Sequence, residues 1–191
     1  MTAKMLSYTS PGAEKIEAVR VAFAGLALRA TGYIVSTQEP AYGASYSVVV
    51  DAEGRTKRIT VRCDDVTGER SLILTRSADG PWIAETVAGS VPQPALVDAV
   101  DVYIADSAFS ASLPVRRLGL HTTVGAEAEV TVASISLPDL TVTPIVHRGR
   151  NEAIDDEGAH IAYSGSYGER HVTVDGDGLF VGSQGLIARV N

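Results

Sequence analysis

The chain has 191 residues, of which 45% are hydrophobic and 20% charged, and its net charge is −7 at pH 7. This composition excludes a disordered chain, and the length suits one domain, residues 1–191, with a single core. The acidic balance argues against nucleic acid or an anionic membrane surface as a partner. No stretch approaches the ~20 apolar residues of a membrane-spanning helix, so we expect no stable membrane insertion.

Cysteine content and the first residues bear on the cellular compartment. Cys63 is the only cysteine, so the chain cannot form an internal disulfide. Residues 1–15 contain no apolar segment of the kind found in a secretory signal peptide. Nothing therefore indicates an oxidising compartment, and we expect a cytoplasmic protein.

Apolar residues alternate with polar ones along most of the first half of the chain. The clearest case is Ile59, Val61 and Cys63, which alternate with Arg58, Thr60, Arg62 and Asp64. Such alternation predicts antiparallel strands with one wet face. Six strands are expected here, over residues 16–23, 26–35, 42–50, 58–64, 70–76 and 82–87. Residues 13–18 would also suit the start of a helix.

Four short segments place an acidic residue before glycine, a pattern typical of tight hairpin turns. They are Asp51 to Gly54, Ala78-Asp79-Gly80, Asp155 to Gly158 and Asp175 to Gly178. Their spacing predicts roughly a dozen antiparallel strands in sequential order. One short helical turn is expected at residues 92–97, and no long helix is.

Residues 126–137 indicate a bent strand. Val130 and Val132 are apolar at even positions, whereas Ile135 and Leu137 are apolar at odd ones. A bulge or strong coiling near Ala133-Ser134 would produce this switch. A sheet of about a dozen antiparallel strands must curl, split or close. Without a long helix, we expect the concave face of a curled sheet to be filled by loops, by a second subunit or by a ligand.

Two arginines interrupt the apolar segment 112–120, which we interpret as a strand beginning at Pro114. In a strand, Arg116 and Arg117 point to opposite faces, so one of them must face apolar neighbours. A buried guanidinium needs a carboxylate or another anion. The carboxylate of Asp101 or Asp98 would make a structural salt bridge. Alternatively, an arginine holds a phosphate, carboxylate or sugar head group at the rim of the concave face.

Three aromatic residues, Tyr46, Trp82 and Tyr103, have two interpretations as well. They either belong to the core or line the concave face, where they would contact a ligand. We find no zinc-ligand spacing among the four histidines and no readable nucleophile–base pair. Gly165 to Gly168 lacks the frame of a nucleophile turn and is interpreted as a hairpin loop. We therefore expect no catalytic residues, no metal and no cofactor.

The arginine segment also carries a family resemblance. Asp101-Val102, the polar segment 107–112 and the run LPVRRLGL at 113–120 resemble the signature of the bacterial putative glycolipid-binding family. Weaker matches follow the family's order, at Gly12 and Glu14, Tyr46 to Asp51, Gly80 to Trp82, 137–142 and 174–181. The resemblance implies an open, strongly curved sheet, half a barrel, like that of bacterial lipoprotein carriers. It also implies a glycolipid or another amphiphile as ligand.

Together these features predict an all-β half-barrel that binds an amphiphile in its concave face without catalysis. The candidate ligand-binding residues are Tyr46, Trp82, Asp101, Tyr103, Val115, Arg116 and Arg117. The alternative is a protein–protein assembly domain, because an open sheet has edges that can pair. In that case a homodimer would cover the concave face and no small ligand would be needed.

Overall fold

The computed structural model describes residues 1–77, 81–165 and 168–191. The predicted turn Ala78-Asp79-Gly80 lies outside the described residues. Gly80, the first residue of the family resemblance at Gly80 to Trp82, therefore lies outside them as well. Ser166 and Tyr167, the centre of the predicted Gly165–Gly168 loop, lie outside them too. All other sequence predictions fall on described segments.

Strands dominate the described part of the chain. They are β1 (Thr2–Thr9), β2 (Lys15–Ala24), β3 (Ala27–Ser36), β4 (Tyr42–Val50), β5 (Thr56–Asp65), β6 (Gly68–Arg76), β7 (Trp82–Thr86), β8 (Gly89–Gln93), β9 (Asp101–Ile104), β10 (Glu127–Ile135), β11 (Val142–Asp155), β12 (Gly158–Gly165), β13 (Gly168–Val174), β14 (Phe180–Ser183) and β15 (Ile187–Arg189). The helical elements are η1 (Pro11–Ala13), η2 (Pro94–Leu96), η3 (Phe109–Ala111) and α1 (Ser112–Arg117).

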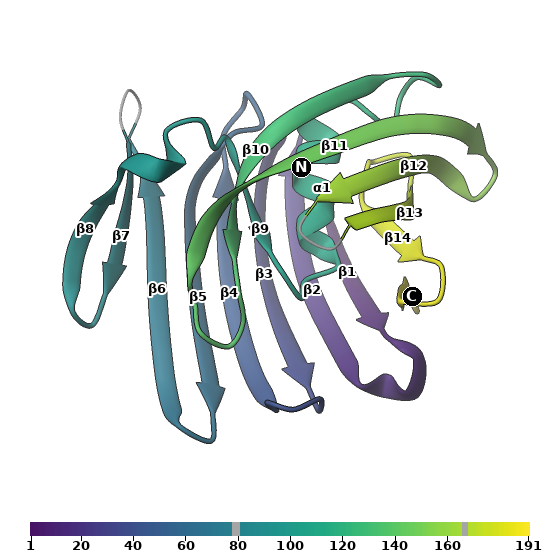
Figure 1. Ribbon diagram of the computed structural model, residues 1–191. Coiled ribbons are helices and arrows are strands. Elements are labelled where there is room, and N and C mark those ends of the chain that lie inside the picture. Colours follow the sequence, from purple (N-terminus) through teal and green to yellow (C-terminus); the bar gives the residue numbers. More distant parts are fainter. Residues whose placement is uncertain (78–80, 166–167) are drawn as a thin grey trace.

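All the strands belong to one open sheet whose end strands are β8 and β9. The sheet runs from β8 back to β1, continues through β15 and then returns to β9. Neighbours pair antiparallel, except that β9 pairs parallel with β10. Figure 1 shows the sheet curving from β8 to the strongly bent β10 to β12. The predicted half-barrel is therefore confirmed, with fifteen strands in place of about a dozen.

The alternation in the first half predicted its strands well. All six expected strands are present as β2 to β7, and η2 supplies the expected helical turn. The three described acidic–glycine turns join β4 to β5, β11 to β12 and β13 to β14. Sequential hairpins explain why local patterns sufficed here, because each strand pairs with its neighbour in sequence.

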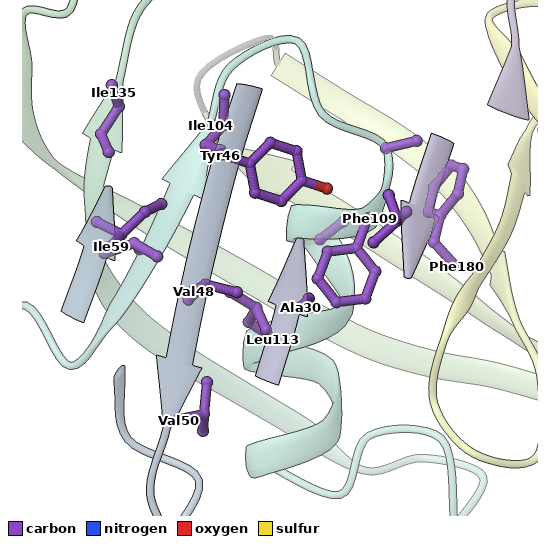
Figure 2. Packing of buried hydrophobic residues seen from close by; sticks show 14 of the residues in the cluster. Ala30, Tyr46, Val48, Val50, Ile59, Ile104, Phe109, Leu113, Ile135 and Phe180 are labelled. Atoms are coloured by element: carbon purple, nitrogen blue, oxygen red, sulfur yellow. The ribbon is translucent and has the colours of Figure 1, made fainter. Parts of the chain in front are cut away.

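The concave face is filled largely by loops and short helical turns of the chain itself, one of the three occupants that we expected. Residues 94–126, called here the covering segment, run through η2, β9, η3 and α1. Figure 1 shows α1 between the two halves of the sheet. Phe109 and Leu113 join a core cluster with Ala30 and Val48 of the facing strands (Figure 2). Short turns suffice because they place an apolar side chain inward every few residues, without a long helix.

The segment 112–120 is not a strand, and this prediction was wrong. It forms α1, preceded by η3, and the backbone turns at Leu118 and Gly119. Pro114 tolerates the first turn of a helix as well as the start of a strand, because N–H groups there have no intrahelical partner. Arg116 and Arg117 lie in the last turn, where positive charge is favoured.

Of the two causes expected for a bend near Ala133-Ser134, a bulge or strong coiling, the bulge is absent from β10, which is nevertheless bent (Figure 1). β10 pairs with β11 without interruption from Glu127 to Ile135. All residues from Val132 to Ile135 are buried, with Ala133 and Ile135 in the main core. A strand covered on both faces has apolar residues at successive positions, which resembles a switch of face. β11 has a register shift between Asn151 and Ala153, in its pairing with β12, away from the Ala133-Ser134 position.

If the covering segment belongs to the core, Phe109→Ala should lower the free energy of unfolding by ~3–5 kcal/mol, because it leaves a cavity in a buried cluster. Val97→Ala removes an exposed side chain of the same segment and should change it by less than ~0.5 kcal/mol. Urea unfolding measures both variants. Equal small losses would mean that the segment contributes little to the core.

Candidate functional site

A pocket of about 360 Å³, called here the end pocket, lies beside the β1–β2 connection. Four parts of the chain line it: the β1–β2 connection, Gln38 of the β3–β4 connection, the covering segment around Asp106, and residues from β12 to β15. Figure 1 shows the β1–β2 connection and the C-terminal strands on the same side of the molecule. The volume lies within the range of about 300–1,000 Å³ typical of small-molecule sites.

The floor of the end pocket is apolar and rigidly packed. Ala108 and Ala111 of the covering segment and Val172 and Phe180 of the sheet line it, and all four are buried. Phe180 packs edge-on against the ring of Tyr8, whose hydroxyl donates to the Phe180 carbonyl oxygen. Leu186, which is 41% exposed, extends this apolar surface toward solvent.

The rim carries charged and amide groups. Lys15 Nζ forms an ion pair with Asp106 Oδ1, and the Tyr42 hydroxyl donates to Asp106 Oδ2. Nearby, Gln38 Nε2 donates to Glu14 Oε2 at 2.7 Å. Of these, Glu14, Lys15, Gln38 and Asp106 line the pocket. The site therefore combines an apolar floor with a polar rim.

A buried carboxylate fixes the covering segment beside the pocket. The Glu17 side chain accepts hydrogen bonds from the hydroxyls of Tyr46 and Ser107, both at 2.6 Å, and from Phe109 N at 3.2 Å. Burial raises the pKa of Glu17 above its ordinary value, although these hydrogen bonds lower it in part. Because Ser107 and Ala108 line the pocket, Glu17 sets the position of the floor from behind.

Two tyrosines of the pocket lining pack against a buried histidine. Tyr103 and Tyr163 line the pocket, and the His147 ring packs edge-on against both, with centroids 4.8 and 5.2 Å away. His147 Nδ1 and the Tyr163 hydroxyl share a hydrogen bond of 2.6 Å. Gly165 allows this packing, since a Cβ there would lie 2.4 Å from the imidazole. Burial lowers the pKa of His147 to about 4.

The predicted salt bridge is present between Arg117 and Asp101. Arg117 Nε and Nη2 approach Asp101 Oδ2 at 3.0 and 2.8 Å, and Asp101 is fully buried. Burial raises the pKa of Asp101, and the Arg117 guanidinium opposes that shift. This pair connects the end of α1 to the start of β9, so it joins two parts of the covering segment to each other.

Arg116 has a different environment, although it is only 8% exposed. Its Nη1 donates to the Asp177 carbonyl oxygen and its Nη2 to that of Gly25, at 2.8 Å for the latter. The guanidinium also lies 4.5 Å from the centre of the Phe23 ring. Burial lowers the pKa of Arg116. Carbonyl oxygens and a π face therefore solvate this cation in place of a carboxylate.

In the described part of the chain, seven residues were predicted to bind a ligand, and only Tyr103 of these lines the end pocket. Tyr46, Trp82 and Val115 are buried in the core. Tyr46 packs against Gly32 and donates to Glu17, while Trp82 Nε1 donates to the Ala99 carbonyl oxygen at 2.9 Å. Asp101, Arg116 and Arg117 have the structural contacts above. A ligand contact by any of the seven stays a prediction.

Sequence reasoning missed most of the pocket lining, including Lys15, Asp106 and Tyr163, and the residues that support it, Glu17 and His147. One signal was readable: Glu17 shares the apolar face of its strand with Val19 and Val21, so a carboxylate had to be buried there. The other residues come from segments far apart in the chain. No local pattern indicates that they meet.

Two further findings concern the described residues as a whole. Their longest α-helix, α1, has six residues. None of the described helices has the length and apolar character needed to cross a bilayer. No group of three or more histidine, cysteine, aspartate or glutamate side chains in these ranges is placed to hold a metal ion.

Comparison with known proteins gave a family and two solved structures. A family model described as Putative glycolipid-binding matches residues 5–189. A crystal structure of a DUF1089 family protein from Pseudomonas aeruginosa is 23% identical, with a TM-score of 0.71, covering 89% of this chain and 90% of that one. A β-barrel-like protein of domain of unknown function DUF1849 from Brucella abortus is 9% identical, with a TM-score of 0.51, covering 98% and 93%. No curated protein matches significantly.

Removing the buried partner of Arg117 should be costly. We expect Asp101→Ala to lower the free energy of unfolding by ~3–5 kcal/mol, because it leaves a largely buried guanidinium without its carboxylate. Glu129→Ala breaks the exposed pair with Arg148 and should cost less than ~1 kcal/mol. Denaturant unfolding separates the two. A loss below 1 kcal/mol for Asp101→Ala would contradict a structural role for the bridge.

Burial of His147 should make stability depend on pH. The unfolded imidazole binds a proton below about pH 6.5, whereas the folded one stays neutral down to about pH 4. His147 should therefore contribute a fall of ~3 kcal/mol in the free energy of unfolding as the pH falls through this window, in addition to the contributions of other groups with shifted pKa values, such as His121 and Glu17. His147→Gln should remove that slope, and His171→Gln, whose side chain is 72% exposed, should keep it. Urea unfolding between pH 7 and 4 measures this, and an unchanged slope in His147→Gln would contradict it.

Proposed function

This chain belongs to the Putative glycolipid-binding family, and from that premise we propose that it is a non-catalytic protein that binds an amphiphile in the end pocket. One observation carries the proposal. The pocket joins a buried apolar floor, made by Ala108, Ala111, Val172 and Phe180, to a charged rim at Lys15 and Asp106. An amphiphile has the same two parts, an apolar chain and a polar head.

The size and stiffness of the pocket support a small ligand. Its floor is fixed by the Glu17 hydrogen bonds and by the Tyr8–Phe180 contact, so little ordering is needed on binding. At about 360 Å³, the pocket suits one short acyl chain or one end of a longer one. Elsewhere on the concave face, the described part of the covering segment packs on the sheet and contributes Phe109, Leu113 and Val115 to the core.

An assembly function remains the alternative, and the free edge at β8 is the observation that favours it. β8 is largely exposed along its five residues, and Val91 on it is 56% exposed. However, the strand is short and contains Pro92, and both features discourage edge-to-edge pairing. The homodimer and the cytoplasmic location expected from the sequence stay predictions, and solution mass tests the former.

Trp82 is buried and does not line the end pocket, so its fluorescence should not report binding there. Binding should instead be measured by two other methods. We expect mass spectrometry of an organic extract to find a co-purified amphiphile, and calorimetry to show saturable binding of a lysophospholipid, a fatty acid or a glycolipid. Leu186→Asp places a carboxylate on the apolar surface that continues the pocket floor. It should therefore weaken binding at least tenfold, ~1.4 kcal/mol.

The matched control is Ile154→Asp, because Ile154 is 45% exposed, close to the 41% of Leu186, and does not line the pocket. It should leave affinity unchanged. The binding function would be contradicted by the absence of any heat or co-purified amphiphile in a correctly folded protein. Equal weakening in both variants would place the ligand elsewhere.

A further inference from the structure

We propose that the outer face of strands β2 to β5 docks on an anionic membrane surface, where its arginines contact lipid phosphates. The outer face is the side of the sheet that points away from the core cluster. It is called here the arginine face and is defined by four exposed residues, Arg20, Arg29, Arg58 and Arg62. None of them is among the described residues that line the end pocket, so this inference goes beyond the proposed function.

Strand alternation places the four arginines on one side of the sheet. Val19 and Val21 flank Arg20 and belong to the core cluster, so Arg20 points the opposite way. The same alternation turns the other three outward. The strands β2 to β5 are consecutive neighbours in the sheet (Figure 1). With strands about 4.8 Å apart and a rise of about 3.4 Å per residue, the paired register puts the four Cα atoms within roughly 17 Å of one another.

The arginine face carries positive charge that the chain itself does not neutralise. The residues directly opposite the four arginines on neighbouring strands are all uncharged: Met5, Ala22, Thr31, Ser45, Val49, Ser71 and Thr75. Across residues 1–77, 81–165 and 168–191, no ion pair includes any of the four. Their guanidinium groups are therefore available to an external anion, to which arginine can donate two parallel hydrogen bonds.

The other half of the sheet shows the opposite arrangement. On β10 and β11, Arg148 lies directly opposite Glu129, and Arg150 lies directly opposite Glu127. Arg148 Nε also donates to Glu129 Oε2 at 2.6 Å. Opposite charges across neighbouring strands stabilise a sheet, and like or unmatched charges do not. The concentration of unmatched arginines on β2 to β5 is thus a local property of that face.

The net charge of −7 does not conceal this face from a membrane. The outward-facing acids of β5 to β7 lie beside it, with Asp64 opposite Glu69 at one end of their strands and Glu85 on β7. Salt screens exposed charges beyond about 8 Å, so a flat anionic surface responds mainly to the side chains that it touches. Basic residues near such a surface each strengthen binding about fivefold.

Apolar side chains beside the arginines favour a membrane over a nucleic acid. Ile16, Tyr33 and Val35 share the outward face of β2 and β3 and are 47, 60 and 52% exposed. Surfaces that lie on a bilayer combine cations with aliphatic and aromatic groups, which enter the head-group region. Sites for single-stranded nucleic acid instead stack bases on several aromatic rings, whereas Tyr33 alone of these three is aromatic.

Co-sedimentation with vesicles of phosphatidylcholine, with and without about 30% phosphatidylglycerol, tests the proposal. We expect binding at least tenfold tighter to the anionic vesicles in about 0.1 M salt, and its loss in about 1 M salt. The double variant Arg29→Gln with Arg58→Gln should weaken this binding at least tenfold. The matched control, Arg148→Gln with Arg150→Gln, removes the same charge from a surface that glutamates neutralise, and it should change binding less than twofold.

A second pair of variants tests the apolar contact. Ile16→Ser should weaken binding to anionic vesicles at least threefold, because binding at the interface scales with the apolar area buried. Ile154→Ser is the control, since Ile154 on β11 is 45% exposed, close to the 47% of Ile16, and it should leave binding unchanged. All the substituted positions are exposed, and circular dichroism checks that each variant is folded.

Equal binding to the two kinds of vesicle, equal losses in the two double variants, or no binding to either vesicle would overturn the proposal. Binding of single-stranded oligothymidylate, lost in the Arg29→Gln and Arg58→Gln variant, with no binding to vesicles, would assign the arginine face to nucleic acid and overturn it as well. Both vesicles carry the same acyl chains, so an acyl chain in the end pocket affects them equally. The outcome is therefore independent of the proposed function.

Discussion

An open sheet of fifteen strands has an apolar concave face that water must not reach, and here residues 94–126 of the same chain cover it. Large exposed apolar surfaces are unusual on soluble proteins, so this covering is a condition of stability. The covering segment has little regular structure, and most of its contribution comes from single buried side chains such as Phe109 and Val115. The backbone of the segment must nevertheless be held in place, and polar contacts do this.

Those polar contacts are few and buried. Asp101 binds Arg117 within the covering segment, and Glu17 of β2 binds Ser107 and Phe109. On the far side, the Ser112 hydroxyl accepts a hydrogen bond from Phe180 N, and Asn151 Nδ2 donates to the Leu120 carbonyl oxygen. Buried carboxylates and hydroxyls favour one arrangement of partners, because the loss of a partner leaves them unsatisfied. They thus fix where each turn of the segment lies on the sheet.

The end pocket is the part of the concave face that the covering segment leaves open. Its floor is built from the last turn before α1 and from β13 and β14, so the same contacts that stabilise the fold also shape the site. This explains why the signature arginines do not touch the pocket lining. Their role is to hold the covering segment, which in turn positions Ser107, Ala108 and Ala111. Under the proposed function, a substitution in the signature would act on binding through this segment.

Sequence alone determined the repetitive part of this protein. Alternating residues in β2 to β7 and acidic–glycine turns predicted the hairpins, because each strand pairs with its neighbour and both periodicity and turn chemistry are local. The need of a buried arginine for a carboxylate, with Asp101 as a candidate, was also readable, since burying an unpaired charge is costly.

Tertiary structure decided the rest. Pro114 permits a strand or a helix start, and only packing against the sheet selected α1. Val132 to Ile135 looked like a change of face because local sequence does not show that both faces of β10 are covered. The end pocket joins Lys15, Asp106 and Phe180, which are distant in the chain. Their proximity follows from the curvature of the whole sheet, a property of all fifteen strands together that no single segment encodes.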